Sequence, residues 1–435
     1  MSEAVSSARP RWLAFVPWLL GFAVLSAPLL WCRTVGNLST DERVFYLPAI
    51  RQIRDHWPRL NLLADSLSAT SPGYPYFLST VSLATGPSFF AMRAVNWLVS
   101  LGVLALLWGL LQRRGGGSLM LALLPLALDN FFVKSSCFVV TDNAALMMMS
   151  ASLAAILFTP SDRGALLGAV SASACVAVRQ INVWLAGPLL WRLWREAQIS
   201  HRWGRLALGL IPVLPLAALF LAWHGLVPPA WAKETYSKMG FNGTALIYLL
   251  TVLFSMGASF YMVATTTRQW RDDFSSPVVL FAGALGLVLV LVSSTVPDFY
   301  YTTGRWGGYW WTLAAHLPVF GHISVPFLVL APLGAAFALA IVRRLWLEAG
   351  MEPCLLWLAV VVPWTAAMLT NRLVFHRYYE PPLLLFLIYW LALLAAARTG
   401  FRLTRRWPLV ALALVQLALT LLTVHAQAYG FFRSG

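Results

Sequence analysis

Two adjacent carboxylates, Asp41 and Glu42, follow the first long apolar segment of the chain. A carboxylate within hydrogen-bonding reach can take the proton of an attacking hydroxyl group, which makes both residues candidate catalytic groups. Ser39 stands three residues before Glu42, the spacing of a helix capping box. We therefore predict that a helix begins at the pair, that Glu42 supports its start or orients Asp41, and that Asp41 is the base. The structural alternative is that both acids only complement a helix dipole.

The elements that carry these residues are predicted to be membrane helices. Of the 435 residues, 60% are hydrophobic and 11% are charged. Because lipid offers no partners for the backbone, we expect one all-α polytopic membrane domain over residues 1–435. Apolar runs near the ~20-residue length of a bilayer span recur about 13 times, at 12–31, 88–111, 118–132, 144–159, 164–178, 181–195, 206–226, 245–266, 277–296, 321–342, 353–370, 381–397 and 408–428.

The arginines fix the expected orientation of these spans. With the N-terminus in the cytoplasm, most arginine-rich turns become cytoplasmic, in agreement with the positive-inside rule. The formal charge of +15 is then explained by orientation and by anionic membrane lipids, and no basic block or base-reading motif indicates a nucleic-acid partner. The excess of Arg over Lys favours a multi-pass protein of a bacterial inner membrane. Its active site is expected to face the periplasm.

The long loops on the extracytoplasmic side are where function is expected. The first, residues 33–87, contains apolar residues every three or four positions, from Val44 through Leu47 and Ile50 to Ile53. This pattern predicts an amphipathic helix at the membrane interface. Such a helix would carry Asp41 to the membrane edge.

Four short motifs occur in order along the chain. They are Asp41-Glu42 followed by Phe45-Tyr46-Leu47-Pro48, then "TSPGYPY" with Thr70, Pro72, Gly73 and Tyr74 or Tyr76, then "VRQINVW" with Arg179, Gln180, Asn182 and Trp184, and finally "FHRYYEPP" with Arg377 and Tyr378. In this order they resemble motifs of the GT-C glycosyltransferases, membrane enzymes that take sugars from polyprenyl-phosphate donors. The closest resemblance is to the terminal alpha-1,2-glucosyltransferase family of lipid-linked oligosaccharide assembly. It implies a GT-C-like helical bundle in which an acid of the first extracytoplasmic loop, here Asp41, is the base.

A polyprenyl-phosphate donor also requires cations that hold its phosphate. Arginine suits this task because its fork can bond two oxygens and stays charged. The predicted phosphate ligands are Arg179, Arg377 and Arg305, each in an extracytoplasmic turn or loop. The remaining predicted substrate contacts are Tyr46, Tyr74, Gln180, Asn182 and Tyr378.

The function expected from these residues is inverting transfer of a hexose from a polyprenyl-phosphate donor to a hydroxyl of a lipid, glycan or protein acceptor. No cofactor is required by the sequence and no metal site is predicted, although a divalent cation could neutralise the leaving phosphate. The alternative is a transporter or flippase of lipid-linked sugars. That alternative predicts broken helices and charges near the middle of spans, whereas this chain keeps its charges mostly at span ends.

Overall fold

The computed structural model describes residues 15–32, 36–63, 68–115, 117–196, 202–237, 239–293, 308–370, 374–398 and 401–428. In the first half of the chain its α-helices are α1 (Val16–Ser26), α2 (Gly36–Asp41), α3 (Leu47–His56), α4 (Gly73–Thr85), α5 (Phe89–Gly115), α6 (Leu124–Ala127), α7 (Asn130–Cys137), α8 (Asp142–Phe158), α9 (Asp162–Val178), α10 (Ala186–Glu196), α11 (Arg202–Leu210) and α12 (Leu214–Trp223). The second half contains α13 (Pro229–Ser237), α14 (Gly243–Ala264), α15 (Thr267–Phe274), α16 (Pro277–Val292), α18 (Tyr309–His316), α19 (Val325–Ala349), α20 (Met351–Leu369), α21 (Glu380–Ala397), α22 (Trp407–Thr420) and α23 (Ala426–Ala428). Two short antiparallel strands, β1 (Val319–Phe320) and β2 (Ile323–Ser324), form a hairpin.

The expected all-α, multi-pass membrane fold is confirmed. Within the described ranges, seven helices are long and apolar enough to cross a membrane, or nine if each of two bent helix pairs counts as one span. This is fewer than the 13 expected spans. The difference arises mainly between residues 118 and 196, where the apolar segments form shorter helices and a pair bent by 65° between α6 and α7.

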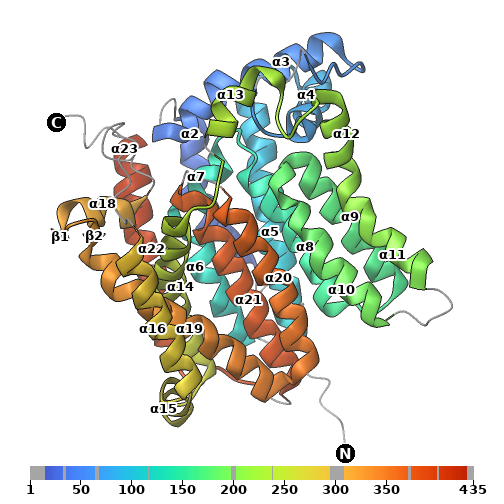
Figure 1. The fold of residues 1–435 in the computed structure, drawn as a ribbon. Coiled ribbons are helices and arrows are strands. Elements are labelled where there is room, and N and C mark those ends of the chain that lie inside the picture. Colours follow the sequence, from blue (N-terminus) through green and yellow to red (C-terminus); the bar gives the residue numbers. More distant parts are fainter. Residues whose placement is uncertain are drawn as a thin grey trace, which may run out of the picture.

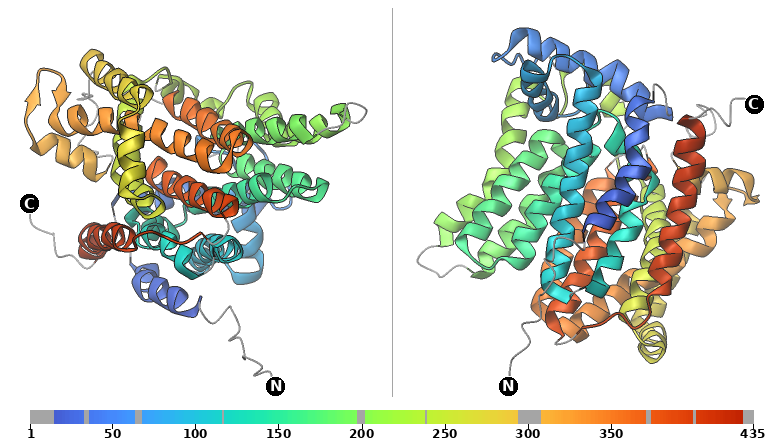
Figure 2. Two further views of the ribbon diagram at one scale, coloured as in Figure 1. Left: turned by 90° about the horizontal axis from the view of Figure 1, so that it is seen from below. Right: turned by 180° about the vertical axis from the view of Figure 1, so that it is seen from behind.

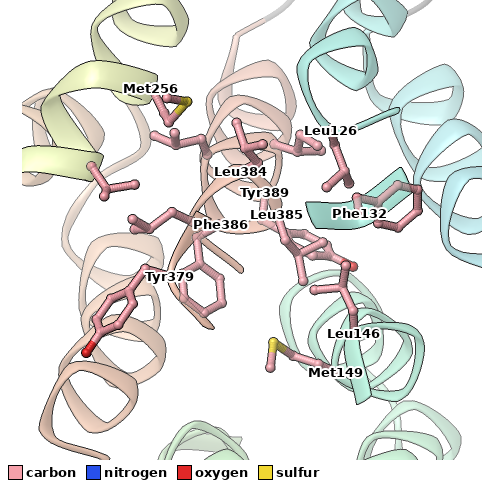
Figure 3. Close-up of a cluster of buried hydrophobic side chains, with 14 of the residues drawn as sticks. Leu126, Phe132, Leu146, Met149, Met256, Tyr379, Leu384, Leu385, Phe386 and Tyr389 are labelled. Carbon is pink, nitrogen blue, oxygen red and sulfur yellow. The ribbon is translucent and has the colours of Figure 1, made fainter. Parts of the chain in front are cut away.

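Helix α21 forms the centre of the bundle. In the candidate span His376–Ala397, 83% of the most apolar window is buried inside the protein, the highest share among the seven spans. Figure 3 shows Leu384, Leu385 and Phe386 of α21 among side chains from α6, α7, α8 and α14. The last helices complete this core, because α22 packs against α6 and α7 (Figure 2). The turn just before α21 is thereby fixed in place.

The two ends of the bundle differ in character. Helices α2, α3, α4 and α13 lie together at one end, and α15 lies at the other (Figure 1). At the α15 end, the fully buried Asp273 pairs with Arg343 and Arg344. Both arginines lie in the last turns of α19, at the end that the positive-inside rule assigns to the cytoplasm. The opposite end, with the predicted interfacial helix, carries the site described next.

The first loop contains the predicted amphipathic helix. Ala49, Ile50 and Ile53 of α3 are buried, and the helix packs against α4, while Arg51 and Asp55 are exposed. The predicted capping box is wrong. The chain is already helical from Gly36 and continues through a π-helical turn at Glu42–Tyr46 into α3, so Ser39 lies inside a helix. Glu42 therefore has no helix start to support.

Candidate active site

One cavity of about 620 Å³ lies at the end of the bundle that carries α2 and α13. Its polar wall is formed by residues of three segments that are far apart in the sequence: Asp41 and Tyr46, then Arg179, Gln180 and Asn182, then Arg377 and Tyr378. Its apolar wall includes Met149, Leu216, Trp364 and Met368. Seven of the ten predicted site residues thus line a single cavity. Its size and mixed lining are typical of a small-molecule site.

Asp41 is held by the turn that precedes α21. Its Oδ2 accepts a hydrogen bond from Nη1 of Arg377 at 2.9 Å, and the two side chains are 25% and 19% exposed. Nη2 of Arg377 donates to the hydroxyl of Tyr378 at 3.0 Å. The carboxylate at the end of α2 therefore faces the cavity as one half of an ion pair.

A second ion pair also lies near Tyr378. Nη1 of Arg179 donates to Oδ1 of Asp142 at 2.9 Å. The guanidinium carbon of Arg179 lies 4.6 Å from the centre of the Tyr378 ring, and that of Arg377 lies 5.0 Å from it. Burial acts against the charge of Arg179, but the carboxylate of Asp142 together with Tyr378 and Tyr46 raises the Arg179 pKa, so this residue stays cationic. Two arginines thus flank one aromatic ring.

Tyr46 connects the first loop to the start of α8. Its hydroxyl lies 3.2 Å from that of Thr141, next to Asp142. Burial raises the pKa of the Tyr46 phenol, although the charge of Arg179 acts in the opposite direction. Tyr46 is therefore a neutral hydrogen-bonding group on the wall of the cavity.

The charges around the cavity leave one positive charge uncompensated. Its charged lining residues are Asp41 and Asp142 against Arg179 and Arg377, which sum to zero. Lys134 of α7 lies outside this lining but acts electrostatically on both Asp41 and Arg377. With Lys134 included, three cations face two carboxylates, for a formal charge of +1. A phosphodiester, which carries one negative charge, would balance this excess.

The "TSPGYPY" and "VRQINVW" motifs contact each other. Oε1 of Gln180 accepts hydrogen bonds from the backbone N–H of Ser71 at 2.9 Å and from its hydroxyl at 3.0 Å. Nε2 of Gln180 donates to the carbonyl of Ala69 at 2.7 Å. Gln180 therefore lines the cavity and also holds residues 69–71 at its rim through these hydrogen bonds.

Gly73 allows α4 to approach the end of α9. A Cβ atom at this position would lie 2.4 Å from the carbonyl oxygen of Ala177, which is backbone and cannot yield easily. We expect Gly73→Ala to lower the free energy of unfolding by about 1–3 kcal/mol through overpacking. Unfolding in detergent micelles measures the loss. Gly21→Ala is the matched control, because nothing lies within 4 Å of a Cβ there; equal stability of the two variants would contradict the expected clash.

Two of the predicted site residues that the structure describes, Glu42 and Tyr74, do not line the cavity. Glu42 is 1% exposed and points to the protein interior, where it pairs with Arg93. Tyr74 is buried and donates to Oδ1 of Asn96 at 2.6 Å. The structure thus gives Glu42 and Tyr74 structural partners in place of substrate. Arg305 lies outside the described residues.

Asp142 is the functional candidate that the sequence analysis missed. It begins α8 in the segment "VVTDNAA" and lines the cavity next to Asn143. The signal was present, because the same topology that places Asp41 outside the membrane also places the turn before residues 144–159 outside. An acid at the start of a membrane helix on the functional side would have been found by that argument.

The turn that carries Arg377 is supported by a buried polar cluster. His376 is fully buried, with Nε2 2.5 Å from Oε2 of Glu380 and Nδ1 2.6 Å from the hydroxyl of Tyr248. The hydroxyl of Tyr309 donates to Oε1 of Glu380 at 3.0 Å, and Gln416 donates to the same oxygen. The cluster joins α14, α18, α21 and α22 behind the turn and so fixes Arg377 and Tyr378 in position. Among the described residues, no group of three or more His, Cys, Asp or Glu side chains is arranged to hold a metal ion.

Comparison with protein-family models and with curated proteins gives no match. Among solved structures, the chain is similar to ArnT from Cupriavidus metallidurans bound to undecaprenyl phosphate, at 14% identity and a TM-score of 0.43 over 89% of this chain and 77% of that one. It is also similar to the apo form of the Archaeoglobus fulgidus oligosaccharyltransferase, at 14% identity and a TM-score of 0.46 over 97% of this chain and 57% of that one. The chain thus spans little more than half of the oligosaccharyltransferase. This likeness assigns no role to any residue.

Proposed function

We propose that the protein is an inverting glycosyltransferase of GT-C type that moves a hexose from a polyprenyl-phosphate donor to an acceptor hydroxyl on the extracytoplasmic side of a bacterial inner membrane. The observation that carries the proposal is the composition of the single cavity described above. Its polar wall holds Asp41 paired with Arg377 and Asp142 paired with Arg179, and an apolar wall continues beside them. The polar wall suits a sugar phosphate and the apolar wall suits the first units of a prenyl chain.

The reaction would proceed by a single displacement. The acceptor oxygen attacks the anomeric carbon while Asp41 takes the proton of that hydroxyl. The bond between the anomeric carbon and the phosphate oxygen breaks, and its electron pair leaves with the polyprenyl phosphate. Arg179 and Arg377 would bind the phosphate, which gains negative charge as the bond breaks. Tyr46, Gln180, Asn182 and Tyr378 would border the sugar.

Release of polyprenyl phosphate is the direct test. The purified protein, reconstituted into lipid vesicles, is supplied with a panel of polyprenyl-phosphate sugars carrying a labelled sugar, together with glycolipid, glycan and peptide acceptors. Formation of labelled acceptor with stoichiometric polyprenyl phosphate supports the proposal. The resemblance to the alpha-1,2-glucosyltransferase family makes a glucosyl donor the first choice in the panel. Absence of turnover with every donor and acceptor would count against the enzyme.

Arg179 provides the second test. A hydrogen bond to a charged group contributes about 1.5–3 kcal/mol, so we expect Arg179→Gln to raise KM for the donor by about 10- to 100-fold. Steady-state kinetics at varied donor concentration measure the change. The control is Arg51→Gln, because Arg51 is an exposed arginine of α3 outside the cavity. An unchanged KM in Arg179→Gln would remove this residue from the donor site.

One observation favours the alternative of a transporter or flippase. The pair α6 and α7 is bent by 65°, and the fully buried Asp129 lies at the break. Broken helices with buried acids are typical of transporters. The two functions differ in product, because a flippase moves the intact lipid-linked sugar across the vesicle membrane and releases no polyprenyl phosphate. The reconstitution experiment therefore separates them.

A further inference from the structure

Two groups compete for the guanidinium of Arg377, which cannot bind both at once: the carboxylate of Asp41 and the donor's phosphate. In the structure its Nη1 donates to Oδ2 of Asp41 at 2.9 Å, and its Nη2 donates to the hydroxyl of Tyr378. The same guanidinium is a proposed ligand of the donor's phosphate. Both Asp41 and Arg377 line the cavity, so an incoming phosphate reaches this ion pair directly.

We propose that the donor's phosphodiester displaces Asp41 from Arg377 and thereby releases the catalytic carboxylate. The proposal rests on the proposed function and deepens it. The ion pair with Arg377 keeps one oxygen of Asp41 occupied. When the phosphate binds the guanidinium of Arg377 in place of Asp41, the Asp41 oxygen becomes free to accept the hydroxyl proton of the acceptor. The base is thus available only when the donor is in place, which makes donor binding the first step of a compulsory order.

The surrounding charges allow this exchange. The second arginine, Arg179, pairs directly with Asp142, and the carboxylate of Asp142 also acts electrostatically on Arg377. Lys134 adds a positive charge that acts on both Asp41 and Arg377.

Competition for one guanidinium has a consequence that can be measured without any acceptor. Removing the charge of Asp41 should strengthen the binding of a polyprenyl phosphate, although it removes the base. A part-exposed ion pair contributes modestly, so we expect Asp41→Asn to bind the lipid about three- to tenfold more tightly than the unaltered protein. Asn is nearly isosteric with Asp and leaves the shape of the site unchanged.

A double-mutant cycle separates competition from a general charge effect. The unaltered protein, Asp41→Asn, Arg377→Gln and the double variant are each titrated with undecaprenyl phosphate in mixed micelles, and bound lipid is quantified by native mass spectrometry. Undecaprenol, which lacks the phosphate, is the matched probe for the prenyl chain. If Arg377 is the contested group, Asp41→Asn tightens binding only when Arg377 is present. Arg377→Lys, which keeps the charge but loses the fork, replaces Arg377→Gln if the latter does not fold.

The outcomes are distinct. Equal tightening with and without Arg377, or no tightening in Asp41→Asn, would overturn the displacement while leaving the donor site in place. Binding of undecaprenyl phosphate no tighter than that of undecaprenol in all four proteins would overturn the proposed function and the displacement together.

Discussion

Replacing Asp41 by Asn is expected to lower kcat for sugar transfer by about 10²- to 10⁴-fold, the usual contribution of a positioned general base. The amide cannot accept the hydroxyl proton, so the attack loses its base. Its oxygen can still accept the hydrogen bond that Arg377 donates to Asp41 in the unaltered protein, so the turn before α21 should keep its position. Transfer from the active polyprenyl-phosphate sugar, measured in vesicles, gives kcat, and unfolding in detergent shows that stability is retained.

The matched control for this variant is Asp55→Asn. Asp55 lies on α3 of the same surface segment and is exposed to solvent, outside the cavity. It should transfer sugar at the unaltered rate. Full activity of Asp41→Asn would exclude Asp41 as the base. It would favour the structural alternative, in which the acid only complements the helix dipole.

Replacing the neighbouring Glu42 by Gln is expected to affect stability and not chemistry, with a loss of about 3–5 kcal/mol in the free energy of unfolding. Oε1 of Glu42 accepts hydrogen bonds from Nε of Arg93 at 2.8 Å and from the backbone N–H of Val139 at 2.9 Å. The Glu42 and Arg93 side chains are 1% and 2% exposed. Removing one charge leaves the other buried without its counter-ion, which is the costly case for a buried pair.

Equilibrium unfolding in detergent micelles measures this loss. Glu352→Gln, at an exposed position in the first turn of α20, is the control and should leave stability unchanged. Arg93→Met should destabilise the protein less in the Glu42→Gln background than alone, because the two side chains act as a unit. The activity of each folded Glu42→Gln molecule should be retained. A stable but inactive Glu42→Gln protein would show instead that Glu42 takes part in the chemistry.

Together the two variants separate residues that are adjacent in the sequence. Successive side chains of a helix point about 100° apart, so one helix can direct one acid into the cavity and the next into the core. Asp41 faces Arg377 across the cavity, whereas Glu42 joins the first loop to α5 through Arg93. The expected result is a folded, inactive protein in one case and an active, unstable one in the other.

Several features follow from the sequence alone. Apolar runs near the thickness of a bilayer predict a helical membrane protein, because only helices satisfy the backbone in lipid. The three-to-four-residue repeat from Val44 to Ile53 predicts an amphipathic helix; Ile50 and Ile53 are buried, whereas Val44 is exposed. The distribution of arginine and the order of the four motifs direct attention to Asp41, Arg179 and Arg377. All three line the cavity.

Tertiary structure decided the partner of each charge. Nothing local distinguishes Asp41 from Glu42, because the choice depends on Arg93 and Arg377, which lie 51 and 336 residues away from their respective partners. The pairing of Asp142 with Arg179 likewise depends on how α8 packs. The capping-box prediction was wrong for a related reason: local spacing does not record that the chain is already helical before Ser39. The sequence pattern predicts which segments form helices and on which side of the membrane their connecting loops lie. Ion pairs between distant segments depend instead on how the helices pack.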